Sequence, residues 1–236
     1  MRIATWAILT ASLLSAPLFA QDSPSTQSQQ SVKPGINDNF LDPDLKVEEW
    51  VKRFEVESRE IFHARDEIVQ QLKLKSGDRI ADIGTGTGLF VEPFAKAVGK
   101  NGWVYAVDIA PKFVERVGKL AEEYQLDNVT PVVCGEDDVR LAPRSIDVAF
   151  ICDVYHHFEY PQSSLESIHK ALVPGGQLVV IDFNRIPGES RDWTLSHVRA
   201  GKEGFRKEIE AAGFEFVEEV KIEAFKENYF LRFTRK

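Results

Sequence analysis

The sequence predicts an α/β fold with a doubly wound, mostly parallel sheet of seven strands and helices on both faces. Strands and helices alternate at short spacing from residue 79 to residue 183, which is typical of a parallel sheet. The segment 146–153 is an almost continuous apolar run, as expected of a strand buried on both faces. Two alternating strands at 214–223 and 228–234 predict a C-terminal antiparallel hairpin.

Local signals support each element. Apolar residues recur at helical spacing in the first two helices. Pro111 suits the start of a helix, Pro174-Gly175-Gly176 stops another, and Gly213 is placed to cap the last one. The predicted elements are helices at 45–55, 58–74, 89–98, 111–126, 161–173 and 204–212, and strands at 79–84, 103–109, 129–134, 146–153, 177–183, 214–223 and 228–234.

The chain has 236 residues, which suits one large domain better than two. We assign this domain to 43–236, with an N-terminal helical cap at 43–78 and the α/β core at 79–236. The formal net charge of -8 disfavours a nucleic-acid substrate, because an acidic chain does not attract phosphates.

The N-terminus differs in kind from the rest of the chain. Arg2 precedes the almost wholly apolar run Ile3 to Leu14, and the sequence up to Ala20 predicts a signal peptide cleaved there. The run is shorter than the ~20 residues that span a bilayer, so an uncleaved anchor is the weaker alternative. We therefore expect export to the periplasm or the medium. The polar segment 21–42 is predicted to be a disordered leader.

A glycine-rich loop follows the first strand. It has the sequence Asp82-Ile83-Gly84-Thr85-Gly86-Thr87-Gly88 and lies where a strand ends and a helix begins. Glycines allow a tight turn and a close approach of the backbone to a ligand. The spacing G-x-G-x-G differs from the G-x-G-x-x-G of nicotinamide-dependent dehydrogenases, which remain the rival interpretation.

Acidic residues end the next two strands. Asp108 lies 24 residues after Gly84, and Glu136 and Asp137 follow the third strand. In a doubly wound sheet these strand ends share one rim, where a carboxylate can accept both hydroxyls of a ribose. The alternative for Asp108 is a helix N-cap ahead of Pro111.

With these motifs, residues 60–236 resemble the class I S-adenosylmethionine-dependent methyltransferases. The glycine loop matches the first motif of that family, and Asp108 matches its ribose-binding acid. Further matches are the segment from Asp153 to Phe158 and the segment from Leu172 to Leu178. The resemblance implies S-adenosylmethionine as cofactor, a small-molecule acceptor, no metal as a rule, and the strand order 3-2-1-4-5-7-6.

The resemblance also implies the cofactor contacts. Glu136 and Asp137 lie where the family contacts adenine, and Asp137 is our choice between them. The expected cofactor-binding residues are Asp82, Gly84, Thr85, Gly86, Gly88, Asp108, Ile109, Glu136, Asp137 and Asp153.

The candidate catalytic residues, Asp153, Tyr155, His156 and His157, follow the fourth strand. We expect them beside the methyl group to be transferred, where a histidine would suit a general base. The alternative is that one histidine packs or caps while the other faces solvent. The segments 54–65 and 196–203 are further candidates to shape the acceptor pocket.

Other functions remain open at this point. The chain could bind the cofactor without catalysis, or methylate a protein. No set of cysteines and histidines has the spacing of a zinc site, so we expect no metal.

The two cysteines, Cys134 and Cys152, are predicted to be free and buried. The implied strand order puts three strand spacings, about 14 Å, between their strands. A disulfide needs Cα atoms within ~7 Å.

Overall fold

The structure is a computed structural model that describes residues 30–57 and 59–236. The predicted signal peptide at 1–20 lies outside these residues and stays a prediction. Within the described ranges, no helix has both the length and the apolar character needed to cross a bilayer.

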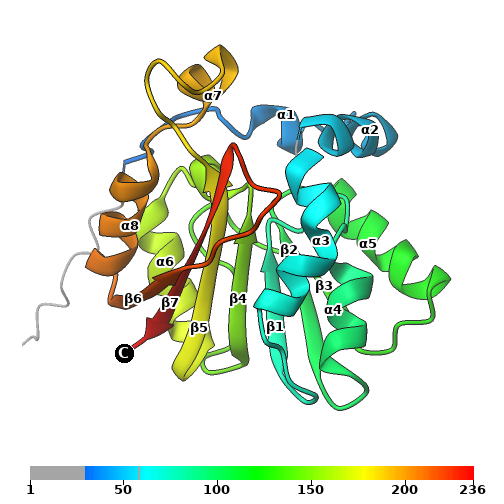
Figure 1. Ribbon diagram of the computed structural model, residues 1–236. Helices are drawn as coiled ribbons and strands as arrows, with labels where there is room; N and C mark the ends of the chain where they lie inside the picture. The colour runs from blue at the N-terminus through cyan, green and yellow to red at the C-terminus, as the bar shows by residue number, and fades with distance from the viewer. Residues whose placement is uncertain (1–29, 58) are drawn as a thin grey trace, which may run out of the picture.

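Seven strands form one sheet in the order β3-β2-β1-β4-β5-β7-β6, which confirms the predicted topology (Figure 1). β1 to β5 pair in parallel, and β7 pairs antiparallel with both β5 and β6. Pro131 is tolerated in β3 because this is an edge strand. The strands are β1 Arg79–Ile83, β2 Trp103–Asp108, β3 Val129–Val133, β4 Ile146–Cys152, β5 Leu172–Phe183, β6 Phe214–Glu219 and β7 Asn228–Arg235.

Helices cover both faces of the sheet (Figure 1). On one face, α3 and α4 pack on the strands through a core that includes Phe94 and Phe150, and Val117 of α5 packs beside it on Ala106. On the other face, α6 and α8 pack through a core that includes Leu165 and Phe205. The helices are α1 Asp38–Leu41, α2 Val47–Glu57, α3 Arg59–Gln71, α4 Val91–Val98, α5 Pro111–Glu123, the 3₁₀ helix η1 Tyr155–His157, α6 Pro161–Ala171, α7 Asp192–His197 and α8 Lys202–Ala211.

Part of the segment predicted to be a disordered leader is ordered, so that prediction is wrong for residues 30–42. We call residues 30–41 the N-terminal strap; it contains α1 and crosses the molecule beside α7 (Figure 1). Glu159 accepts hydrogen bonds from Ser31 Oγ (2.5 Å) and from Gly35 N (3.2 Å). Asn37 is buried, and its Nδ2 donates to the carbonyl of His157 at 3.0 Å. Hydrogen bonds between its polar residues and polar groups of the core therefore help to order this segment.

Replacing Glu159 by alanine tests whether this carboxylate holds the strap. Glu159 is buried, so its loss leaves the Gly35 amide and the Ser31 hydroxyl without their acceptor. We expect amide hydrogen exchange across residues 32–37 to accelerate at least tenfold, which corresponds to about 1.4 kcal/mol of local opening free energy. Glu189→Ala, at an exposed position, is the control. Unchanged exchange in Glu159→Ala would show that other contacts hold the strap.

Candidate active site

The glycine loop lies between β1 and α4, where it was predicted. The amides of Gly84 and Thr85 both donate to the carbonyl of Val107 in β2, at 2.8 and 3.0 Å. Gly84 has φ +76°, and a Cβ there would lie 2.4 Å from Cγ1 of Val154. Only glycine therefore allows the loop to approach both β2 and the segment after β4.

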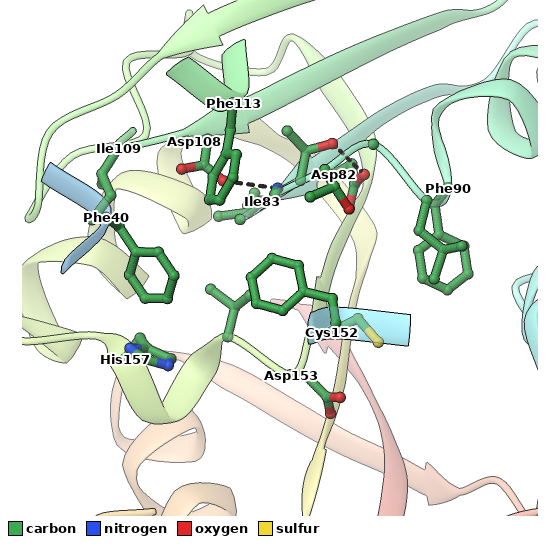
Figure 2. A pocket seen from close by; sticks show the side chains of 18 of the residues that line it. Phe40, Asp82, Ile83, Phe90, Asp108, Ile109, Phe113, Cys152, Asp153 and His157 are labelled. Atoms are coloured by element: carbon green, nitrogen blue, oxygen red, sulfur yellow. Dashed lines mark hydrogen bonds between the residues drawn. The ribbon is translucent and has the colours of Figure 1, made fainter. Parts of the chain in front are cut away.

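Two buried carboxylates stand beside this loop (Figure 2). Asp108 accepts from the amide of Gly86 through Oδ2 and from that of Ala110 through Oδ1, both at 2.8 Å. Asp82 accepts from the hydroxyl of Thr85 at 2.8 Å. The N-cap position of α5 is occupied by Ala110, so Asp108 is not the cap that the alternative interpretation required.

Burial sets the electrostatics of this pair. Desolvation raises the pKa of Asp82 to about 7, and the nearby charge of Asp108 adds to the effect. Desolvation also raises the pKa of Asp108 to about 6, although three backbone amides stabilise its ionised form. Both carboxylates are therefore poorly compensated, and a ligand that brings hydrogen-bond donors or positive charge would stabilise them.

A cavity of about 390 Å³ opens in front of these groups. Asp82 and Asp108 lie on one side of it, and Phe40, His157 and Asp153 lie on the other (Figure 2). Its volume falls within the range of small-molecule sites. Of the predicted cofactor-binding residues, those that line it are Asp82, Gly84, Thr85, Gly86, Gly88, Asp108, Ile109, Glu136 and Asp153.

The acidic segment after β3 lines the cavity with residues other than Asp137, which was our choice for the adenine contact. Glu136 and Asp138 line the cavity, whereas Asp137 is not among its described lining residues. Burial and the charges of Glu159, Asp137 and Asp38 raise the pKa of Glu136. Glu136 is thus the better placed of the two predicted adenine contacts.

An aromatic cluster from the N-terminal elements covers the cavity. The ring of Phe40 lies 4.8 Å from that of Trp50, and Phe54 lies 6.0 Å from Phe113, as measured between centroids. Phe40 also meets the ring of His157 edge-on at 5.3 Å. From the predicted segment 54–65, the described lining residues are Phe54, Ile61, Phe62 and Arg65.

The four candidate catalytic residues separate into two groups. Asp153 and His157 line the cavity, whereas Tyr155 and His156 are not among its described lining residues. Tyr155 is fully buried, and its hydroxyl donates to Glu208 at 2.5 Å. The Glu208 carboxylate, which also pairs with Arg199, ties η1 to α8, so Tyr155 has a structural contact, and its catalytic role stays a prediction.

His156 is also turned away from the cavity. Its Nδ1 lies 2.8 Å from Oδ1 of Asp182, a fully buried carboxylate of β5, and its backbone amide donates to Oδ2. His156 thus corresponds to the packed histidine of the alternative interpretation. The other histidine does not face solvent as that interpretation expected, since it lines the cavity.

His157 is unsuited to be a general base. Burial lowers its pKa to about 2, and the charges of His156, His197 and Lys33 act in the same direction. A proton acceptor is most effective when its pKa lies near the working pH. The neutral imidazole of His157 can instead exchange hydrogen bonds with a bound ligand.

Asp153 begins the segment after β4 in a left-handed conformation, with φ +53°. Asp is one of the residue types that tolerate this region, and such conformations gather at functional sites. Its Oδ1 accepts from Nδ2 of Asn228 at 2.8 Å, which anchors the carboxylate to the start of β7. Asp153 is therefore held in place beside the cavity.

Both cysteines are free, as predicted, although each is half-buried rather than fully buried. Cys152 lies at the end of β4 and Cys134 just after β3, with β1 and β2 between these strands. Burial raises the pKa of the Cys134 thiol to about 12, so it stays protonated and unreactive.

The strap and α5 supply residues that the sequence did not reveal as part of the site. Asn37 and Phe40 lie in a segment that lacks a periodic pattern, so no sequence signal marked them. Phe113 lies at the start of a predicted helix and could have been found from the rule that ligands bind at the carboxyl edge. His197, within the predicted segment 196–203, lies against His157 with 3.2 Å between their Nε2 atoms.

Residues 81–180 match a family described as "Methyltransferase domain". The ubiquinone/menaquinone biosynthesis C-methyltransferase UbiE of Hydrogenovibrio crunogenus is 31% identical over 115 residues, which are 48% of this chain and 45% of the relative. The chain thus spans less than half the length of that curated relative.

Solved structures share the fold. A SAM-dependent methyltransferase from Aquifex aeolicus superposes with a TM-score of 0.70 at 22% identity, covering 80% of this chain and 98% of that one. The [4+2]-cyclase SpnF superposes with a TM-score of 0.62 at 16% identity, covering 73% and 81%. These likenesses establish the architecture, and the second shows that the same fold carries other chemistry.

The fold, the glycine loop and the family match over residues 81–180 together support a class I S-adenosylmethionine-dependent methyltransferase domain. S-adenosylmethionine is the cofactor that this family implies, and the buried carboxylates and glycine loop of the cavity fit it.

Gly84→Ala tests the close approach of the glycine loop to Val154. The new Cβ combines the strain of a positive φ with a 2.4 Å clash, so we expect strong destabilisation, on the order of 3 kcal/mol or more. Gly77→Ala is the matched control, because Gly77 also has a positive φ but no atom lies near its Cβ position. Thermal unfolding should show a much smaller loss for Gly77→Ala. Equal losses would show that backbone strain, and not the contact with Val154, makes the glycine necessary.

Asp82→Asn tests the cost of the buried carboxylate. The folded-state pKa is raised to about 7 from 3.8, so its contribution to stability is present at low pH and is lost as pH rises towards 7. The amide removes this loss and can still accept from Thr85. We expect the variant to be more stable than wild type by roughly 2–4 kcal/mol at pH 8, with the gain shrinking towards pH 4.

Denaturant unfolding between pH 4 and pH 8 measures this difference, and Asp127→Asn, at an exposed position, is the control. A gain that does not depend on pH would contradict the assignment of the effect to the charge of Asp82.

Proposed function

We propose that this protein transfers a methyl group from S-adenosylmethionine to a small aromatic acceptor. The observation that carries the proposal is the pair of buried carboxylates, Asp82 and Asp108, at neighbouring strand ends facing one cavity. Relatives that match about half of the chain are named as methyltransferases, which supports the reaction class.

One half of the cavity suits the cofactor. Asp108 is placed to accept the hydroxyls of a ribose, and Gly84 and Gly86 let the backbone come close to the ligand. Asp82 gives this half a negative charge that favours a cationic ligand. When bound, S-adenosylmethionine supplies a methyl group already activated by its sulfonium charge.

The cavity also has walls that suit an apolar, planar acceptor. They include the rings of Phe40, Phe54, Phe113 and Phe158, and Val154 lines the cavity as well. Aromatic walls favour a flat ring through stacked and edge-on contacts. The relative's printed role in ubiquinone and menaquinone biosynthesis supports a hydroxylated aromatic ring of the quinol kind.

The residues of the site act by positioning and by excluding water. The strap and α2 cover the cavity with apolar groups, which keep solvent from the transferred methyl group. Neutral His157 can hold an acceptor hydroxyl by a hydrogen bond. If the acceptor atom is carbon, a ring proton must leave after the carbon–carbon bond forms, and Asp153 is the anchored carboxylate beside the cavity that can take it.

We also retain export as part of the proposal. It is supported by the charge and hydropathy pattern of the first twenty residues. Fractionation of the expressing cell tests the export of the protein directly. An exported enzyme also requires that the methyl donor reach the same compartment.

Calorimetric titration of S-adenosylmethionine and S-adenosylhomocysteine into the purified protein tests the cofactor. We expect micromolar binding that Asp108→Ala weakens at least tenfold, about 1.4 kcal/mol or more, because the ribose hydroxyls lose their acceptor. Asp127→Ala, at an exposed position, should bind as wild type. No binding by folded wild type would overturn the proposal.

The acceptor is tested by incubating protein and methyl donor with hydroquinone and naphthohydroquinone and following product mass. A product heavier by one methylene unit supports the proposed acceptor, and its fragmentation tells carbon from oxygen methylation. Cofactor binding without turnover across hydroxylated aromatic acceptors would favour a protein that binds the cofactor without catalysis.

A further inference from the structure

Three histidines meet beside the cavity although they come from separate segments. His156 and His157 belong to η1, and His197 ends α7, forty residues later along the chain. One ring nitrogen from each lies within 4.8 Å of the others. An adjacent pair of histidines and a third one forty residues later have no recognisable metal spacing, which is why the sequence predicted no metal site.

The spacing of two of these nitrogens is that of metal ligands. Nε2 of His157 and Nε2 of His197 are 3.2 Å apart. Two nitrogens bound to one tetrahedral zinc ion, at about 2.0–2.1 Å each, are separated by about 3.3 Å. A contact this short also requires that at least one nitrogen present a lone pair, so both rings cannot be charged there.

Asp182 orients His156, the third of these histidines. Oδ1 of Asp182 lies 2.8 Å from Nδ1 of His156, and Oδ2 accepts a hydrogen bond from the His156 amide at 3.0 Å. Nε2 of His156 is therefore left as the ligand atom. Carboxylates that hold the far nitrogen of a histidine are typical partners of metal-bound imidazoles, because they fix the tautomer and the ring orientation. Asp182 also brings one negative charge that offsets the charge of a cation.

Packing fixes the ring of His197. Trp193, one turn earlier in α7, stacks on it with 4.7 Å between centroids and 20° between planes. The strap holds the end of the helix, because Lys33 Nζ donates to the carbonyls of Ser196 and His197. The ammonium of Lys33 is the main opposing feature, since it places a positive charge near the cluster.

We propose that His156, His157 and His197 form a three-histidine site for a divalent transition metal ion, with Zn²⁺ as the intended occupant. Three neutral imidazoles suit zinc and leave a fourth position open. His157 lines the cavity, so a ligand bound there can reach the open position. Binding of the ion is independent of the proposed methyl transfer. A role in holding an acceptor oxygen rests on that proposed function.

Metal binding is tested on the untagged protein, after dialysis against a chelator and then against Zn²⁺. We expect one zinc per chain by elemental analysis, and visible absorption typical of tetrahedral coordination when Co²⁺ replaces it. His197→Ala should weaken zinc affinity at least tenfold, as measured by competition with a chromophoric chelator. Asp182→Asn should weaken it by 10- to 100-fold through loss of the carboxylate that orients His156.

His63→Ala is the matched control, because His63 is an exposed histidine of α3 outside the cluster. Lys33→Met should tighten zinc binding by removing the opposing charge. His197→Gln, which keeps more of the side-chain volume, distinguishes ligand loss from unfolding, and thermal unfolding is recorded for each variant.

Zinc binding of similar strength in wild type and in both His197 variants would overturn the proposal, as would less than a fifth of an equivalent bound to folded wild type. Calorimetric binding of S-adenosylmethionine, measured on the zinc-free protein, keeps this outcome separate from failure of the proposed function.

Discussion

The position of β1 between β2 and β4 is the constraint on which the site depends. From β1 the chain crosses to α4 on one face of the sheet, and from β4 it crosses to α6 on the other (Figure 1). The loops that leave these two strands therefore diverge and leave a crevice at their carboxyl ends. The clash that any Cβ on Gly84 would have with Val154 shows how closely the two loops approach at its base.

The position of β1 also explains why the two carboxylates beside the cavity are buried at a cost in electrostatic free energy. Asp82 and Asp108 are brought close to each other by the parallel pairing of β1 and β2, and both are buried there without a basic partner among the hydrogen bonds they make. Such an arrangement opposes folding at neutral pH and favours a ligand that compensates it. The same desolvated charges lower the stability of the folded chain and favour the binding of such a ligand.

The parts of the fold that follow from local sequence could be predicted, and the others could not. Gly84 and Asp108 are recognisable because a strand, a turn and an acid at the next strand end form a local pattern. The burial of Asn37 against His157 depends on a contact between residues 120 positions apart, for which the strap has no periodic signal. The contact of Tyr155 with Glu208 was missed for the same reason, since the two residues lie 53 positions apart.

These non-local contacts shape the part of the cavity that the proposed function assigns to the acceptor. The matched family region, 81–180, contains the glycine loop and Asp108, whereas the strap, α2 and α7 lie outside it. A [4+2]-cyclase shares this fold, so the core alone does not specify a reaction. The aromatic cover from Phe40 and Phe54, and the contact of His197 with His157, are supplied by the segments outside the match. Under the proposed function, the choice of acceptor is therefore set by the elements that the core holds at its rim, and the segment first taken for a leader is one of them.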